Sequence, residues 1–241
     1  MGEPLPPLVV GVKRSLWRLH DPEREDADEQ FRAARRSVLE RDRYTCRYCG
    51  FATIPKREAP PGLREASGFL EVHHLDDNHA NNRPQNLVTV CPFCHQVFHC
   101  GNAGQRDAAQ VIWLPWLRQE DLNLLVNCAA VALVRGNDAA QEANTLMTWL
   151  EYQEGPVVSL YGEAMAHADA LGTALMGIHK EDPALYAERR RVLWGVRLLP
   201  KVDAFERAVK WWAERAWLPE TQWEQIYRAW MDSEAGAGRA V

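Results

Sequence analysis

Apolar residues recur at helical spacing near the start of the chain and over most of its second half. Residues 25–41 combine an acidic first half with an apolar stripe, a pattern that predicts an amphipathic helix. The later segments predicted as helices are 118–135, 138–152, 158–178, 184–194, 204–217 and 222–232. Gly136, just after one of these segments, and Pro183, at the start of another, are typical of helix boundaries.

Shorter apolar runs between these helical segments predict β-structure. Residues 8–18 contain two such runs and are expected to form a hairpin, whereas residues 70–74 and 86–90 predict two strands within a region rich in Cys, His, Asn and Gly. The predicted class is therefore α+β. The expected parts are an N-terminal hairpin and helix (1–40), a small metal-bound module (41–105) and a helical domain (106–241).

The composition is that of a folded globular protein, with 46% hydrophobic and 25% charged residues among 241. No apolar run is long enough to span a bilayer, and the first ten residues do not resemble a secretory signal, so we expect a cytoplasmic protein without membrane insertion. The net charge is −5, but residues 31–60 sum to +5. Arg41, Arg43 and Arg47 in this window are candidate DNA phosphate contacts, and a solvated helix face is the alternative.

Two C-x-x-C pairs give the strongest chemical signal. Each pair offers two thiolates from one tight turn, and four thiolates satisfy the tetrahedral preference of Zn²⁺. Two local disulfides, or one redox pair and a coincidence, are the alternatives, and a reducing compartment disfavours both. The predicted ligands of a structural Zn²⁺ are Cys46, Cys49, Cys91 and Cys94.

Histidines gather in the same region. His73 and His74 end the predicted strand, while His95 and His99 are four residues apart and share one face of a predicted helix. One strand histidine and two helix histidines make a plausible set of metal ligands. Because side chains alternate along a strand, His74 points away from His73 and is free to act as a general base. A surface or capping role is the alternative for each histidine taken alone.

The segment RDRYTCRYCG…LEVHHLDDNHANNRPQNLVTVCPFCHQVFH, from Glu40 to about His99, resembles the HNH (ββα-metal) nucleases that have an added four-cysteine zinc site. The resemblance implies that His74 is the general base and that Asn86 braces the loop and orients it. It also implies a second, catalytic divalent metal (Mg²⁺, Mn²⁺, Ni²⁺ or Zn²⁺) whose ligands are His73, His95 and His99. The loop 75–85 departs from the short glycine turn of simpler members.

The rest of the chain resembles a different group of proteins. The words VIWLP and QEDLN, followed by VRLLP and WWA, occur in the same order in the IcmJ/DotN proteins of type IVB (Dot/Icm) secretion systems. That resemblance implies an HNH-like zinc fold used as a scaffold, with the coupling-protein ATPase or other secretion subunits as partners.

The sequence therefore supports two hypotheses. One is a secretion-associated IcmJ/DotN-like subunit, with metal-dependent DNA endonuclease activity retained; the other is a free-standing HNH endonuclease. Ten tryptophans, mostly in the second half, favour aromatic core packing over partner docking. Because neighbouring helix positions are about 100° apart, we expect one of Trp211 and Trp212 to be exposed as a docking anchor.

Overall fold

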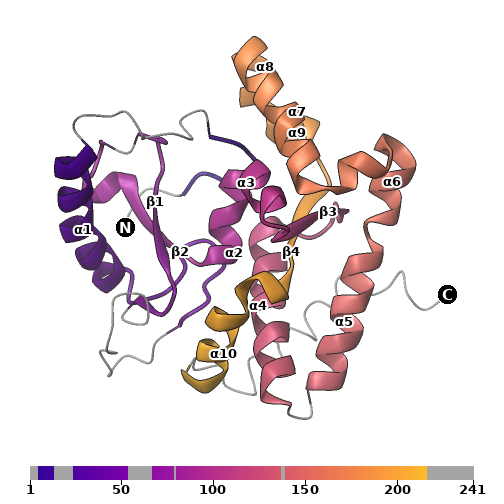
Figure 1. Ribbon diagram of the computed structural model, residues 1–241, viewed down its shortest axis with the longest axis horizontal. Coiled ribbons are helices and arrows are strands. Elements are labelled where there is room, and N and C mark those ends of the chain that lie inside the picture. Colours follow the sequence, from indigo (N-terminus) through magenta and orange to yellow (C-terminus); the bar gives the residue numbers. More distant parts are fainter. Residues whose placement is uncertain (1–4, 14–23, 54–66, 79, 137–138, 216–241) are drawn as a thin grey trace.

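The computed structural model describes residues 5–13, 24–53, 67–78, 80–136 and 139–215, and side chains from residue 31 onward within the first helix. This part of the chain is mostly helical and contains two small antiparallel sheets, so it mixes α and β structure as expected. Figure 1 shows α1 and the first sheet on one side and helices α4 and α5 on the other. The elements are α1 (Arg24–Arg41), β1 (Glu71–His74), β2 (Leu87–Val90), α2 (Pro92–His95), α3 (Cys100–Gln105), β3 (Ala109–Trp113), α4 (Gln119–Arg135), α5 (Ala140–Tyr152), α6 (Gly155–Tyr161), α7 (Ala168–Glu181), α8 (Pro183–Ala187), α9 (Arg189–Val192), β4 (Val196–Pro200) and α10 (Glu206–Arg215).

The first sheet pairs β1 with β2, and α1 packs against it. Its register places His73 opposite Val88 and His74 opposite Leu87. All four residues of β2 are buried, which explains its unbroken apolar sequence between Asn86 and Cys91. Pro92 then occupies the first turn of α2, where a missing N–H costs nothing. The sheet thus leads directly into the helical turn that bears Cys94 and His95.

The second sheet pairs β3 with β4 and was absent from the sequence prediction. Val111 lies opposite Leu198, and both are buried in the core. The strands overlap the sequence segments VIWLP and VRLLP, which are separated by 80 residues of mostly helical chain. Gln119, at the start of α4, links this sheet to the helix. Its side chain accepts a hydrogen bond from the Leu198 N–H and donates one to the Leu198 carbonyl, both at 2.9 Å.

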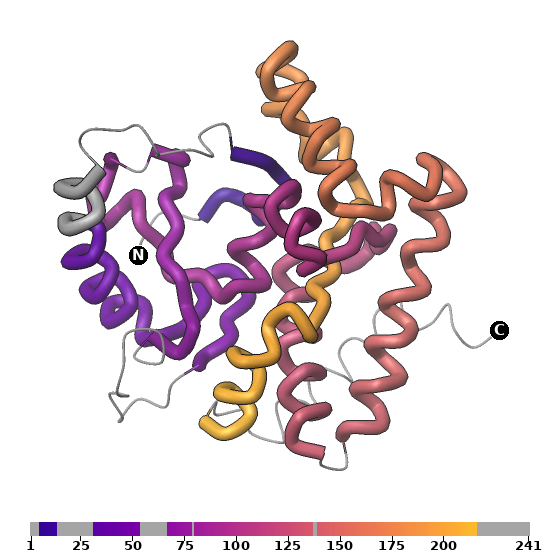
Figure 2. The backbone as a smooth tube through the Cα atoms, in the orientation of Figure 1, coloured from indigo at the N-terminus to yellow at the C-terminus, as the bar shows by residue number. Residues whose placement is uncertain are grey.

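Helix α4 lies at the centre of the molecule. It is buried along most of its length and ends at Gly136, which adopts the left-handed conformation (φ 61°) expected of a helix C-cap. In Figure 2 the yellow tube of α10 returns beside the pink tube of α4. The expectation that one of Trp211 and Trp212 is exposed is wrong, because their exposed fractions are 9% and 0%. Helix α10 is covered on two sides.

Several predicted elements need correction. The segment 158–178 is two helices, because Gly162, at φ 85°, separates α6 from the short turn before α7. Residues 8–13 of the predicted hairpin form no strand; instead Gly11 donates to the Val97 carbonyl and accepts from the Cys100 N–H. Residues 14–18 and the segment 222–232 lie outside the described residues. The domain boundaries at 40 and 105 stay predictions, and one continuous core extends across both positions.

The backbones of helices α3 and α7 approach each other closely at glycine residues. A Cβ placed on Gly172 would lie 2.3 Å from the Cα of Gly101, and one on Gly104 would lie 2.0 Å from the Asp169 nitrogen. Neither position can accept a side chain without a shift of backbone. Among the described helices, none is both long and apolar enough to cross a membrane.

Candidate metal centres

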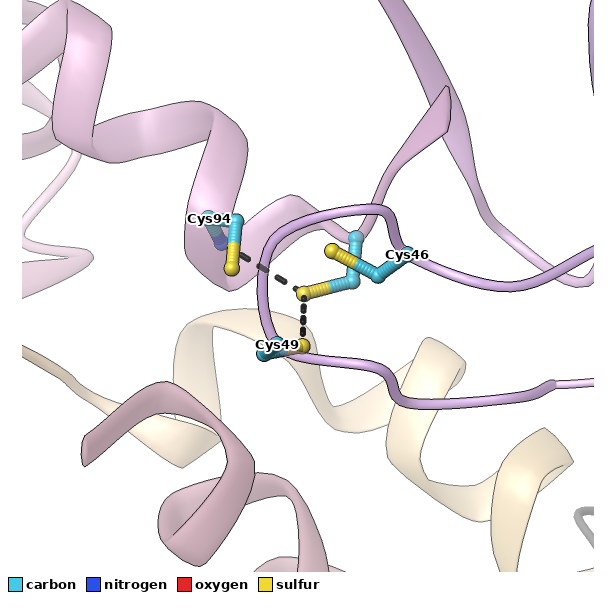
Figure 3. A group of neighbouring side chains, drawn as sticks. Cys46, Cys49 and Cys94 are labelled. Carbon is cyan, nitrogen blue, oxygen red and sulfur yellow. Dashed lines mark hydrogen bonds between the residues drawn. The ribbon is translucent and has the colours of Figure 1, made fainter. Parts of the chain in front are cut away.

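The four cysteines of the two C-x-x-C pairs come together in space. Cys46 and Cys49 lie in a tight turn closed by the Gly50 N–H on the Cys46 carbonyl, with Gly50 at φ 76°. Cys91 and Cys94 come from the N-terminal end of α2, where the Cys91 sulfur also accepts from the Cys94 N–H. All four sulfurs lie within 4.8 Å of one another. Figure 3 shows the sulfurs of Cys46, Cys49 and Cys94 directed toward one point.

The donor set fits a tetrahedral metal ion. The Sγ atoms of Cys49 and Cys91 are 3.7 Å apart, far beyond a disulfide bond and close to the roughly 3.8 Å separation that two 2.3 Å Zn–S bonds would give. Each of the four cysteines is buried and free of a disulfide in this structure, which favours a metal over the alternative of two local disulfides. Burial, followed by the neighbouring thiol of Cys46, raises the pKa of Cys49 well above its usual range. A divalent cation would supply the charge that lets such buried thiols ionise.

Two asparagines of α4 complete the four-cysteine cluster. Asn123 donates to Cys94 Sγ at 3.3 Å and to the Phe93 carbonyl at 3.2 Å, and Asn127 donates to Cys91 Sγ at 3.6 Å. Both side chains are fully buried. No role for these two asparagines was predicted from the sequence. Their i, i+4 spacing, which places both amides on one face of a helix, was the available signal.

The second cluster, formed by His73, His95 and His99, lies at the end of β1 and around α2. One ring nitrogen from each residue lies within 4.8 Å of the other two. The buried His73 Nδ1 has no hydrogen-bond partner in the described chain, as expected of a nitrogen reserved for another ligand. Burial, and then the charge of His95, lowers the pKa of His73 to about 2, which keeps its imidazole neutral and able to bind a metal.

Glu71 is a member of this site that sequence analysis missed. It lies two residues before His73, hence on the same face of β1, and its carboxylate contacts His95 Nδ1. A carboxylate in that position orients the imidazole and leaves Nε2 for a metal. Lys13 approaches from the N-terminal segment; it is buried and forms a 2.8 Å ion pair with Asp77 of the loop after β1.

The structure places His74 apart from the three-histidine cluster, as strand alternation predicts. Its ring is buried, stacks on Phe31 of α1 at 5.1 Å, and bonds through Nε2 to Asn82 Oδ1 at 3.0 Å. Asn86 braces the loop: its amide donates to Asp76 Oδ1 and to the Asn81 carbonyl. These bonds hold Asn86 against the loop, and the roles proposed for His74 and Asn86 stay predictions.

The three arginines proposed to contact DNA differ in their surroundings. Arg41 donates to Asp42 and to the carbonyls of Pro84 and Leu87, so its guanidinium links α1 to the loop before β2. Arg47 also pairs with Asp42, at 3.1 Å. Arg43 is exposed, with a left-handed backbone (φ 53°). Arg41 is thus engaged within the chain, and the role of these residues in DNA binding stays a prediction.

The chain has the architecture of a small mixed α and β protein, in which a cluster of four buried cysteines that could bind a metal joins the first sheet to a helical body. No family model matches it. It is similar to the type 4 apparatus protein DotN of Legionella pneumophila subsp. pneumophila, with 28% identity over 204 residues. The similarity covers 83% of this chain and 86% of DotN. It therefore includes both the cysteine cluster and the helical half.

Proposed function

We propose that this protein is an IcmJ/DotN-like subunit of a type IVB secretion system, in which a structural Zn²⁺ bound by the four cysteines holds the scaffold together. The observation that supports this proposal is the similarity to DotN over most of both chains. Similarity confined to the cysteine turns would suit any small zinc module. Because it extends through the helical half, it favours a shared role of the whole chain.

The position of the four-cysteine cluster suits a scaffold rather than a reactive centre. The cysteines are buried, and the cluster joins the turn after α1, the start of α2 and the middle of α4. A structural zinc site is closed in this way, whereas a catalytic zinc keeps an open position. The proposed zinc would therefore fix the relative placement of the first sheet and the helical half.

The proposed partners are the coupling-protein ATPase or other secretion subunits, bound by the helical half. Since Trp211 and Trp212 are buried, the exposed apolar residues of α5 and α6 replace them as candidate anchors. Tyr152, Leu160 and Tyr161 lie within ten residues of one another and are 76%, 64% and 53% exposed. Large exposed apolar side chains are candidates for contact with a protein partner.

Co-expression with the other secretion subunits of the same cell tests this proposal. We expect the wild-type protein to co-purify with at least one of them. Leu160→Asp combined with Tyr161→Asp should weaken that association, whereas Val134→Asp, on an exposed position of α4, should not. Failure of the wild-type protein to recover any subunit would contradict the secretion proposal.

A second proposed activity is metal-dependent hydrolysis of DNA phosphodiesters in an HNH-like site, favoured by the convergence of His73, His95 and His99. A metal bound there would act as a Lewis acid. Of the three histidines, His99 lines a cavity of about 370 Å³ between the N-terminal segment, α3 and α7, together with Lys13, and we propose that a phosphate approaches from this cavity. For His74 to contact water, Phe31 would have to move away from the imidazole ring.

Plasmid cleavage with added Mg²⁺, Mn²⁺ or Ni²⁺ tests this activity. General-base removal costs about 10²–10⁴-fold in rate, so His74→Ala should abolish visible cleavage while the four-cysteine cluster keeps its metal. His95→Ala should also abolish it, through loss of the second metal. Equal cleavage by wild type and both variants would show that the activity comes from a contaminant.

A further inference from the structure

A cavity of about 520 Å³ borders the first cysteine turn, and none of the three clustered histidines lines it. It is enclosed by the N-terminal segment (residues 5–10), the first cysteine turn (residues 47–48), the start of α4 (residues 118–120) and the chain from α9 into β4 (residues 190–197). We call it the arginine pocket, because four guanidinium groups line it. They belong to Arg47, Arg118, Arg190 and Arg197.

The positive charge of the arginine pocket is not fully compensated. Glu120 is the only carboxylate among the residues that line it, and its Oε1 accepts the Leu8 N–H. Arg118 is neutralised by Asp121, but Arg47 shares Asp42 with Arg41. Within the described chain, no carboxylate forms an ion pair with Arg190 or Arg197. A net positive cavity on a protein of net charge −5 indicates selection for an anion.

Arg197 shows this imbalance most clearly. It is partly buried, and its guanidinium donates to three backbone carbonyls, those of Pro115, Leu117 and Val196. Carbonyl oxygens orient the group without cancelling its charge, and burial lowers its pKa. The charge of Glu120 acts on Arg197, but no carboxylate of the described chain forms an ion pair with the guanidinium, so a further anion would stabilise this partly buried cation. The three carbonyls hold the guanidinium in place at the wall of the pocket.

Two further donors at the pocket have no acceptor in the described chain. The hydroxyl of Tyr48 is buried without a hydrogen-bond partner. The N-terminus of the 17-residue α4 also ends here, and its N-cap residue Arg118 makes no side-chain capping bond. Open amide groups at a helix N-terminus favour anions.

We propose that the arginine pocket binds a nucleoside phosphate, with the phosphate held by Arg47, Arg190 and the start of α4, and the base against Trp194. Several guanidinium groups around one cavity suit phosphate, whose oxygens accept paired N–H bonds. Trp194 lines the same pocket and is 62% exposed, which gives a planar base a ring to stack on. The volume is in the range of small-ligand pockets, which favours a mononucleotide over an extended acidic peptide.

Calorimetric titration of the full-length protein with AMP tests the proposal, in buffer without added divalent metal so that the three-histidine cluster does not contribute. We expect one AMP per chain. Adenosine and inorganic phosphate, titrated separately, should each bind at least tenfold more weakly than AMP. AMP affinity should fall as salt rises, because the main contacts are ionic.

Single substitutions test whether AMP binds in the arginine pocket. Arg190→Glu should weaken AMP binding at least tenfold. Arg191→Glu makes the same charge change one residue away, at a side chain that pairs with Glu188 and does not line the pocket, so it should bind like the wild type. Tyr48→Phe should weaken binding several-fold without lowering the melting temperature, since the hydroxyl has no partner within the described protein.

Other results would overturn the proposal. These are no AMP binding at millimolar concentration, equal AMP binding by wild type and Arg190→Glu, or phosphate binding as tightly as AMP. Preferential binding of an Asp- and Glu-rich peptide, lost in Arg190→Glu, would instead assign the pocket to a protein partner.

Discussion

Asn123 Nδ2 lies 3.3 Å from Cys94 Sγ, so an amide in the second turn of α4 is hydrogen-bonded to a sulfur in the single turn of α2. The same amide also reaches the Phe93 carbonyl, and Gln119 donates to its Oδ1 from one turn earlier. N–H groups directed at thiolates offset the negative charge that four sulfurs bring to a Zn²⁺ ion. The helical half therefore contributes hydrogen-bond donors to the cysteine centre in addition to covering it.

Removing this amide should weaken both the fold and the metal site. We expect Asn123→Ala to lower the free energy of unfolding by about 1–3 kcal/mol, because the Phe93 carbonyl and the Gln119 amide each lose a buried partner. Zinc affinity should fall about 10–100-fold, the usual effect of losing a group that orients metal ligands. Denaturant unfolding and competition with a chromogenic chelator measure the two effects. Asn144→Ala, at an exposed position of α5, should change neither.

The variant Cys91→Ser distinguishes two roles of Cys91, a ligand of a structural metal and a residue that only caps α2. Serine is a good N-cap residue and can still accept the Cys94 N–H, so the start of α2 should survive the change. If Zn²⁺ is bound, loss of one thiolate should lower stability by several kcal/mol and reduce the zinc content below one per chain. Elemental analysis and thermal unfolding measure this. Unchanged stability in Cys91→Ser, or folded wild-type protein containing no metal, would exclude the structural zinc.

Asp42 should make the fold sensitive to acid. Burial alone would raise its pKa, but hydrogen bonds from Arg41 and the Thr89 N–H outweigh burial and lower it below the ordinary value of 3.8. The folded state therefore favours the carboxylate, and this stabilisation is complete above about pH 4 and is lost as pH falls through the lowered pKa.

Asp42→Asn should cost about 1–3 kcal/mol at pH 7, a value reduced because both arginines are partly exposed. The difference in unfolding free energy between wild type and variant should shrink below pH 4, and urea titrations at a series of pH values would measure it. Asp121→Asn, which breaks the exposed pair with Arg118, should cost less than about 1 kcal/mol. A difference that stays constant with pH would contradict the assignment.

The glycine contact between α3 and α7 predicts opposite effects for two substitutions on one helix. Gly172→Ala places a methyl group against the Gly101 backbone and should destabilise the protein by about 2 kcal/mol or more. Gly177→Ala has open space and should stabilise it by about 0.5–1 kcal/mol through helix propensity. Thermal melts of the two variants provide the comparison, and destabilisation of equal size in both would show that α7 does not pack on α3 in this way.

Local patterns in the sequence predicted those parts of the structure that depend on neighbours along the chain. The ends of α1 and α4, the strands of the first sheet and the cysteine turns lie close to their predicted positions, since each depends on spacing within a few residues. The second sheet was missed because β3 and β4 are each five residues long and far apart in sequence. No local period distinguishes such strands from short apolar connections.

Side-chain environments depended on contacts that no local pattern contains. Trp211 and Trp212 point in different directions, yet Phe69 covers one ring, while Phe51 and Phe93 cover the other. The prediction of an exposed ring assumed that α10 has a free side. Phe31 over His74 is a similar case, because the helix that supplies it lies forty residues upstream.

Cys94 and His95 are consecutive residues of the single turn of α2, so one peptide bond links the two candidate metal centres. Because the sulfur belongs to a buried cluster and the imidazole to a half-buried one, closure of the cysteine centre would fix the direction in which His95 projects. The sulfur site would then bind its metal before the nitrogen site does. An ion at the sulfur site would act as a template for the nitrogen site, and loss of the first ion would disorganise the second before any histidine had been altered.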